Sequence, residues 1–207
     1  LAGNSKIAFD QVEIFQRKKN GSSKSNFYSI QEIKKLDKKK SLLIKKDLKN
    51  ITVRRKKICG IKFDEPKIMG VLNITPDSFS DGGIFFETKK AFDQANLMAN
   101  SGAAIIDVGG ESTRPESKIV KEDEEWNRIK ETIINLRKSN PKIIISLDTR
   151  KSQIMKKGIE NGVNIINDVS GLEFDKKSFD LINSKKIPFI LHHMQGTPNT
   201  MQKNPKY

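Results

Sequence analysis

Short apolar runs alternate with amphipathic stretches along the chain from residue 67 onward. The runs are rich in Ile, Val and Leu and too short for helices, so they indicate buried strands. One intervening stretch, 121–138, opens on acidic residues and closes on Arg137 and Lys138, the charge order that a helix dipole favours. Strands that alternate with helices form parallel sheets, so the pattern predicts an α/β fold of about five βα units. The predicted strands cover 67–73, 104–108, 142–147, 163–167 and 187–193, and the remaining predicted helices cover 88–101, 152–161 and 175–184.

The segments that follow these strands are more polar than the segments that precede them. Asp148 follows the third run, Asn167 ends the fourth, and His192 and His193 end the fifth. This asymmetry is typical of a TIM-type barrel, whose carboxyl-terminal rim holds the functional site. A Rossmann-like sheet would need Gly-x-Gly-x-x-Gly after its first strand, and the sequence has no such turn there. The expected fold is therefore a (β/α)8 TIM-type barrel, incomplete in this chain, over residues 67–207.

Residues 1–66 lack a long periodic pattern. We expect an irregular, Lys-rich extension that packs on the barrel domain. Its local patterns predict strands at 7–15, 41–44 and 50–53, a turn at 20–25 and a short helix at 31–40.

The positive charge of the chain is concentrated in this extension. Residues 1–57 carry 17 Lys and Arg against 5 Asp and Glu, whereas residues 58–207 carry 22 against 20, within a net charge of +14. The extension has no recognisable nucleic-acid-binding motif. We therefore favour a Lys-rich composition with a solvated surface over an anionic partner.

Other bounds come from apolar length, cysteine content and the chain ends. No apolar stretch approaches the ~20 residues of a membrane-spanning helix, and no secretory signal pattern opens the sequence. The one cysteine, Cys59, excludes an internal disulfide and suits a reducing compartment. We expect a cytoplasmic protein with neither membrane nor nucleic-acid partners. The chain begins at Leu1 and stops at Tyr207 in a loop-like stretch, so we expect it to be part of a longer product.

Several polar residues at the strand ends are candidates for binding a flat heterocycle. The Asp148 carboxylate can accept paired hydrogen bonds from an amidine-like ring edge or bind a metal, and its alternative role is to cap the next helix. Asn167 offers a donor and an acceptor to the same ring, with a turn role as the alternative. His192 and His193 occupy adjacent strand positions, which face opposite ways, so they are poorly placed to share one zinc ion.

Other strand-end residues suit anionic groups. Asn73 and the cluster at Asp77, Ser78 and Asp81 could hold a hydrated cation or a polyphosphate. Thr113 and Arg114, in a Gly-rich segment, could grip a phosphate or carboxylate, although a lone Arg in a loop is often simply solvated. The sequence contains no visible Ser-His-Asp, Cys-His or P-loop constellation. This favours a reaction driven by positioning and electrostatics.

Five segments in this order closely resemble dihydropteroate synthase, the folate-pathway enzyme that sulfonamide drugs inhibit. They are MGVLNITPDSFSDGG (69–83), DVGGESTRP (107–115), SLDTR (146–150), IINDVSG (165–171) and HMQGTPNTMQ (193–202). The first two motifs are highly specific, and the resemblance runs from about residue 67 to the end of the chain. It implies a transferase that joins 6-hydroxymethyl-7,8-dihydropterin diphosphate to 4-aminobenzoate and releases pyrophosphate with the help of Mg²⁺. It also implies a homodimer for the full-length protein.

The resemblance implies roles for individual residues. Asn73 would bind the magnesium pyrophosphate, Asp148 and Asn167 would hydrogen-bond the pterin, and His192 would lie beneath it. Thr113 and Arg114 would lie near the diphosphate and aminobenzoate and help bind them. The residues implied in catalysis, from the two segments that border the site, are Asp77, Phe79, Asp81 and Arg114.

Three departures from the family pattern matter. His192 stands where the family usually has Met, and Glu116 where it commonly has Gly. The chain also stops after the fifth strand, so it lacks the Asp, Lys, Arg and His that the family supplies from strands six to eight. Five parallel strands cannot close a barrel and would leave an open apolar edge. We therefore expect the isolated chain to be poorly soluble and inactive, and the complete gene product to be active.

Two other functions stay open. One is a pterin-binding methyltransferase of related barrel fold that handles methyltetrahydrofolate; the polar segments 75–83 and 111–115 favour the synthase, because they suit a diphosphate. The other is a non-enzymatic protein in which residues 1–66 form a basic binding module on a degenerate barrel. The sequence leaves undecided the role of the extension, the oligomeric state and whether sulfonamides bind.

Overall fold

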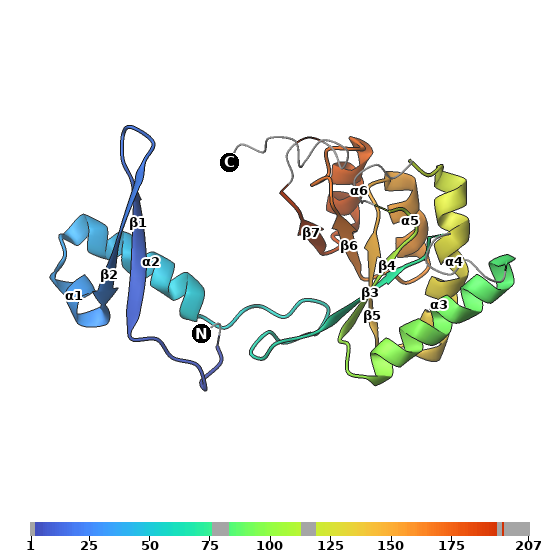
Figure 1. Ribbon diagram of the computed structural model, residues 1–207, viewed down its shortest axis with the longest axis horizontal. Coiled ribbons are helices and arrows are strands. Elements are labelled where there is room, and N and C mark those ends of the chain that lie inside the picture. Colours follow the sequence, from blue (N-terminus) through green and yellow to red (C-terminus); the bar gives the residue numbers. More distant parts are fainter. Residues whose placement is uncertain (1–2, 76–82, 113–118, 194–195, 197–207) are drawn as a thin grey trace. The chain divides into compact units, whose positions relative to one another are not determined.

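The computed structural model describes residues 3–75, 83–112, 119–193 and 196. The chain divides into two compact units, Leu1–Pro66 and Lys67–Tyr207. Figure 1 shows the elements of each unit. No helix of the described residues is long and apolar enough to cross a membrane.

The first unit has regular secondary structure, so the expectation of an irregular extension is wrong. An antiparallel hairpin of β1 (Gln11–Arg17) and β2 (Ser23–Ser29) is followed by α1 (Ile30–Lys35) and α2 (Lys38–Thr52). Ser29 caps α1 in a capping box with Glu32, a Ser-x-x-Glu signal that was available in the sequence. How this unit packs against the second stays a prediction.

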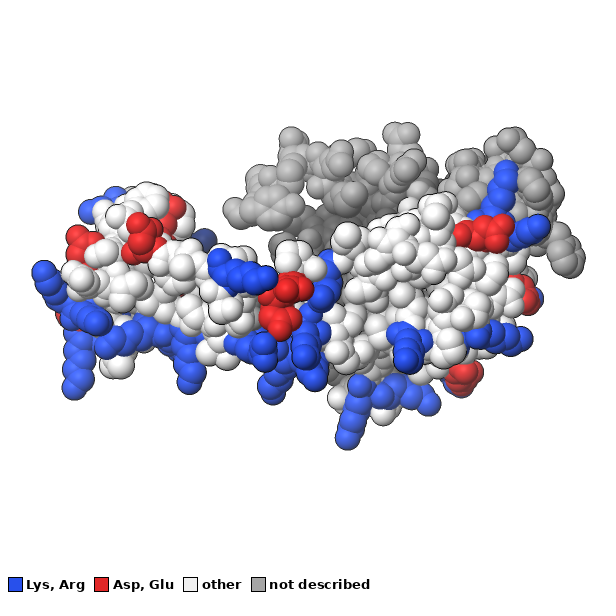
Figure 2. Space-filling model, turned by 90° about the horizontal axis from the view of Figure 1, so that it is seen from below, with Lys and Arg blue, Asp and Glu red and all other residues white. Residues whose placement is uncertain are grey.

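The strands predicted at 41–44 and 50–53 are also wrong, because both ranges lie in α2. The Asp37 side chain accepts a hydrogen bond from the Lys40 backbone N–H at 2.9 Å and starts this helix. Asp37 also separates α1 from α2, so the single helix predicted at 31–40 is two helices. Ser41, Ile44 and Leu48 are its more buried residues, at helical spacing. Many of its exposed positions are lysines, although Leu42 and Leu43 are exposed as well, and Figure 2 shows Lys and Arg side chains projecting from this unit.

The second unit is a parallel sheet covered by helices, as the alternating pattern predicts. Its strands are hydrogen-bonded in sequence order, and Figure 1 shows its helices gathered along the sheet. Every predicted strand and helix is present, with ends that differ by a few residues. The strands are β3 (Met69–Asn73), β4 (Ile105–Gly109), β5 (Ile144–Asp148), β6 (Ile165–Asp168) and β7 (Phe189–Leu191), and the helices are α3 (Gly83–Asn100), α4 (Glu122–Ser139), α5 (Ser152–Glu160) and α6 (Lys177–Lys185).

The apolar core lies between the sheet and these helices. Leu72, Val108, Leu147 and Ile166 form one register row across four strands, and all four are buried. Side chains alternate between the faces of a strand, so the next residue of each strand belongs to the opposite face. The residues that follow these four, Asn73, Gly109, Asp148 and Asn167, therefore lie on the face of the sheet away from the helices.

The edges of the described sheet are open. β3 and β7 are the outer strands, and Val71, Phe189 and Leu191 are exposed there by 55%, 43% and 65%. Apolar side chains at a free strand edge favour pairing with further strands. This arrangement is part of a barrel; the poor solubility of the isolated chain stays a prediction.

Candidate functional site

Four residues at the carboxyl ends of neighbouring strands form one row across the sheet. Asn73 pairs with Gly109, Gly109 with Asp148, and Asp148 with Asn167 in the parallel register. Asp148 and Asn167, which the sequence assigns to the same heterocycle, are therefore direct neighbours. Adjacent strands lie about 4.8 Å apart, so the row spans roughly 14 Å across the four strands, which is long enough for a bicyclic ring to lie along part of it.

Two consecutive glycines shape this row from its two sides. A Cβ on Gly109 would lie 3.4 Å from both the Asn73 Oδ1 and the Asp148 Oδ2 atoms, so this glycine keeps open the space between these two side chains. A Cβ on Gly110 would lie 2.9 Å from Ile129 Cγ2 and 3.0 Å from the Glu125 backbone O, both in α4. The first glycine leaves the space between these two side chains without a side chain of its own, and the second lets the helix approach the strand end.

A hydrogen-bond chain orients Asn167. Its Nδ2 donates to Asp107 Oδ2 at 2.9 Å, and its Oδ1 lies 2.9 Å from His192 Nε2. Asp107 is 3% exposed, and its Oδ1 is buried with no hydrogen-bond partner among the described residues. Ser146, the register neighbour of Asp107, has an Oγ in the same condition. Buried polar atoms without partners are rare and indicate a place where a bound ligand or water completes the network.

Asp107 was missed as a site residue by sequence reasoning. The signal was present, because a carboxylate in an otherwise apolar buried strand needs a partner. His192, by contrast, contacts Asn167 as one of a pair of adjacent histidines. Of the two histidines, His192 is therefore the one whose ring nitrogen lies within hydrogen-bond distance of Asn167.

Asp148 holds the most perturbed carboxyl of the site. Burial, assisted by the negative charges of Asp107, Glu125 and Asp168, raises the pKa of Asp148 to about 7. Asp148 does not cap α5, the alternative considered above, because the N-cap is Lys151 and Asp175 Oδ2 accepts from the Ser152 N–H at 2.9 Å. Asp148 is half-buried and makes no hydrogen bond that would fix its carboxyl among the described residues, so it is a candidate ligand-binding group.

A cluster of four buried charges lies between the ends of β4 and β5 and the helix α4. Arg150 Nε contacts Glu111 Oε2 at 3.0 Å, and Lys151 Nζ contacts the same atom at 3.0 Å and also Glu125. Thr149 Oγ1 donates to Glu125 Oε1 at 2.5 Å. We call Glu111, Glu125, Arg150 and Lys151 the ion cluster. Sequence reasoning read Glu125 only as part of an acidic helix start, because local pattern does not reveal which acid faces inward.

Burial and bonding act in opposite directions on Glu111. Burial disfavours its charged form, but hydrogen bonds from Arg150, the Val120 N–H and Lys151 outweigh it and lower the pKa of Glu111. The carboxylate therefore stays ionised at neutral pH.

Several expected site residues lie outside the described residues. The structure places Asn73, Asp148, Asn167 and His192 together. The residues outside the described ranges belong to the segments after β3 and β4. They are Asp77, Ser78, Phe79, Asp81, Thr113, Arg114 and Glu116.

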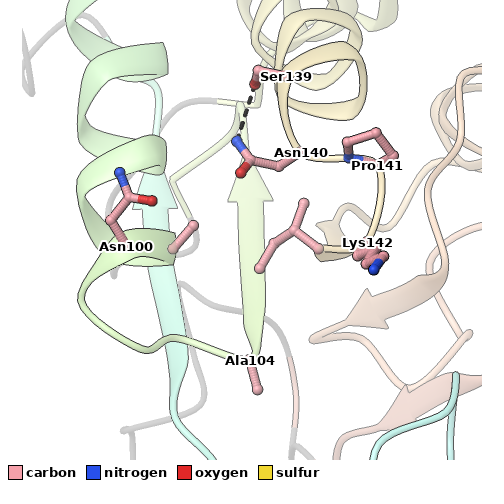
Figure 3. Close-up of a pocket in the computed structure, with 8 residues that line it drawn as sticks. Asn100, Ala104, Ser139, Asn140, Pro141 and Lys142 are labelled. Carbon is pink, nitrogen blue, oxygen red and sulfur yellow. Dashed lines mark hydrogen bonds between the residues drawn. The ribbon is translucent and has the colours of Figure 1, made fainter.

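A hollow of about 500 Å³ lies at the other end of the sheet, where β4 and β5 begin. Figure 3 shows Asn100, Ala104 and Asn140 around it, with the Asn140 amide hydrogen-bonded to Ser139. Asn140 also donates to Asn96 Oδ1 at 2.7 Å. The Asn140 amide is therefore already bonded within the protein, and the hollow lies at the opposite end of the strands from the strand-end row.

Comparison with known proteins decides the family. Residues 69–207 match the family described as pterin binding enzyme. The chain belongs to this family. It is 43% identical over 149 residues to the dihydropteroate synthase of Neisseria meningitidis serogroup B, covering 71% of this chain and 52% of the relative. It is 42% identical over 148 residues to the Escherichia coli K12 enzyme, covering 72% and 52%.

Solved structures agree. The chain is similar to a Yersinia pestis dihydropteroate synthase in complex with a sulfonamide drug, with a TM-score of 0.65 and 36% identity over 73% of this chain and 55% of that one. It is also similar to the Xanthomonas albilineans enzyme with 4-aminobenzoic acid, with a TM-score of 0.62 and 36% identity over 65% and 49%. The resemblance and the fold class are thus confirmed. The chain spans about half the length of the curated relatives it matches.

Proposed function

We propose that the protein containing this chain is a dihydropteroate synthase, which condenses 6-hydroxymethyl-7,8-dihydropterin diphosphate with 4-aminobenzoate. The observation that carries this proposal is the row of Asn73, Gly109, Asp148 and Asn167, next to the buried oxygens of Asp107 and Ser146 that have no hydrogen-bond partner within the described ranges. A pterin presents a flat edge of N–H donors and acceptors. Asp148 accepts from that edge, and Asn167, oriented by Asp107 and His192, both donates and accepts.

The raised pKa of Asp148 fits this role. A carboxylate that is costly to ionise because of burial gains most from the hydrogen-bond donors that a ligand brings to it. His192, beneath the ring in this proposal, replaces the Met usual in the family and supports Asn167 directly.

Asn73 fits a magnesium site. Its Oδ1 faces the space that Gly109 keeps open, and an amide oxygen is a ligand type that Mg²⁺ accepts. Mg²⁺ typically uses one or two protein oxygens together with substrate phosphates and water, so a single protein ligand is sufficient here. When bound, the ion would neutralise charge on the departing diphosphate.

The remaining roles fall on the segments after β3 and β4. We propose that Asp77, Phe79 and Asp81 help form the aminobenzoate pocket and that Thr113 and Arg114 stabilise the diphosphate. The C–O bond to the diphosphate breaks and the pterin methylene develops cationic character; the neutral arylamine nitrogen then forms a C–N bond to this carbon, and the amine loses a proton to water. This substitution needs no protein nucleophile, since charge stabilisation and positioning supply the catalysis.

The test is pyrophosphate release by the full-length protein. Release should require both pterin diphosphate and 4-aminobenzoate, and a sulfonamide should compete with the aminobenzoate. A methyltransferase would instead transfer a methyl group from methyltetrahydrofolate and release no pyrophosphate. Absence of release with both substrates present would refute the synthase.

Partners and location are proposed with the function. We expect the full-length protein to be a cytoplasmic homodimer without nucleic-acid or membrane partners. Light scattering on the full-length protein tests the dimer. Removal of residues 1–66 should leave pterin affinity unchanged; binding of anionic polymer that depends on this segment would favour the basic-module alternative.

A further inference from the structure

The side-chain amide of Asn167 carries an oxygen on one side and a nitrogen on the other. The two are almost equal in size, so packing does not decide which way the amide faces. Its hydrogen-bond partners decide instead, because the nitrogen only donates and the oxygen only accepts. In the described part of the chain these partners are Asp107 and His192.

Only one of these two partners has a fixed polarity. A carboxylate accepts hydrogen bonds and has none to donate, so Asp107 Oδ2, 2.9 Å away, requires the nitrogen of Asn167. The His192 Nε2 atom donates in one tautomer of the imidazole and accepts in the other, so it adapts to either side of the amide. Asp107 therefore sets the direction of the Asn167 amide, and His192 follows it.

Asp107 lies one layer below the strand-end row. It comes two residues before Gly109 in β4, so its side chain is on the same face of the sheet as the row. Asp107 is 3% exposed, which leaves almost no surface for direct contact with a ligand. Among the described residues it also has no ion pair. A buried carboxylate without a cation is a poor stabilising element, which favours a role in orienting Asn167.

We propose that Asp107 is a positioning residue that selects the ring edge accepted by the site, by holding the Asn167 amide in one direction. This inference rests on the proposed function, since it takes the ligand to be a pterin. Along one edge a pterin has an acceptor, N1, beside a donor, the 2-amino group. A lumazine has a 2-oxo group and a hydrogen on N1, so donor and acceptor exchange places. A fixed amide pairs with one of these edges, whereas an amide that is free to turn pairs with either.

A merely structural role for Asp107 makes a different prediction. Loss of a structural contact would lower stability and weaken both rings by the same factor, whereas loss of a positioning contact moves the two affinities in opposite directions. In Asp107→Asn the partner both donates and accepts, so the Asn167 amide turns freely. Half of the molecules then face the wrong way for pterin, which weakens its binding about twofold. In wild type, lumazine must turn the Asn167 oxygen against the Asp107 carboxylate; without that penalty it binds about tenfold more tightly.

The experiment compares D107N and S146A in the full-length protein. Affinities for 6-hydroxymethylpterin and 6-hydroxymethyllumazine are measured by calorimetric titration, and stability by urea unfolding. We expect D107N to lower the preference for pterin about twentyfold without loss of stability. Ser146 is the matched control, because it is also buried, is the register neighbour of Asp107 and has an Oγ with no hydrogen-bond partner among the described residues. S146A should keep the wild-type preference. Lumazine binding no stronger in D107N than in wild type, or the same change in S146A, would overturn the proposal.

A double-mutant cycle separates the effect on Asn167 from an effect of charge. The negative charge of Asp107 contributes to the raised pKa of Asp148, and D107N removes it without acting through Asn167. In an N167A background the large loss of preference should disappear, because no amide remains to turn; its persistence would contradict the proposal. The titrations need no turnover. A wild type that prefers pterin but releases no pyrophosphate refutes only the proposed function, whereas pyrophosphate release with an unchanged preference in D107N refutes only this inference.

Discussion

Asp148→Asn should stabilise the protein while weakening pterin binding. The Asp148 carboxyl has a pKa of about 7 in the folded state, raised by burial and by neighbouring carboxylates, against 3.8 for the ordinary side chain. Below pH about 4 the carboxyl is protonated in both states and has no effect. Between about pH 4 and 7 the unfolded chain is ionised while the folded protein keeps the proton, so the free energy of unfolding falls as the pH rises. Above pH about 7 both states are ionised and the loss is complete.

The size of the effect follows from the shift. A difference of about three pKa units corresponds to about 4 kcal/mol, with 1.36 kcal/mol per unit. By the same linkage, the cost is about 4 kcal/mol at pH 8 and about 1.5 kcal/mol at pH 5. Asn has the shape of Asp without the charge, so D148N should recover most of this cost at pH 8 and much less at pH 5. Loss of charge-assisted hydrogen bonds should weaken pterin binding roughly tenfold to a hundredfold.

Urea unfolding of the full-length protein at pH 5 and pH 8 measures the difference, with calorimetric titration of the pterin beside it. Asp93→Asn, at an exposed position of α3, is the control and should change neither quantity. A D148N variant that is no more stable than wild type at pH 8 would refute the reasoning. An equal gain in the free energy of unfolding of D148N at pH 5 and pH 8 would also refute it, since the gain would then not come from the cost of ionising the carboxyl.

Further substitutions separate the roles of the other site residues. Gly110→Ala should lower the free energy of unfolding by about 1–3 kcal/mol, because its Cβ would press on Ile129 and the α4 backbone. Gly109→Ala should leave stability in urea nearly unchanged but weaken the binding of pterin diphosphate. Equal destabilisation by both variants would contradict the different roles given to the two glycines. His192→Met should weaken pterin affinity about two- to tenfold through the lost contact with Asn167, and unchanged affinity in a titration would show that this contact does not support the ligand. The isolated 207-residue chain should be poorly soluble and release no pyrophosphate, since the β3 and β7 edges are open; a soluble, active preparation would disprove this.

Local pattern was sufficient for the second unit and failed for part of the first. The strands of the second unit are short apolar runs between amphipathic helices, and each falls within a few residues of its predicted range. In the first unit, apolar pairs such as Leu42 and Leu43 suggested strands. A helix formed instead, because Asp37 caps it and Ser41, Ile44 and Leu48 share its inner face. Two adjacent apolar residues carry no period, so only the longer spacing distinguishes the two structures.

The sequence alone determined the order of strands and helices, the five motifs and hence the family, because these depend on spacing along the chain. Tertiary structure decided which of the polar residues meet. Parallel register places Asp148 beside Asn167, and helix packing buries Glu125 while leaving Glu124 exposed. The perturbed pKa of Asp148 and the bond from Val120 to Glu111 also depend on the fold, because burial and distance between remote residues exist only once strands and helices have packed.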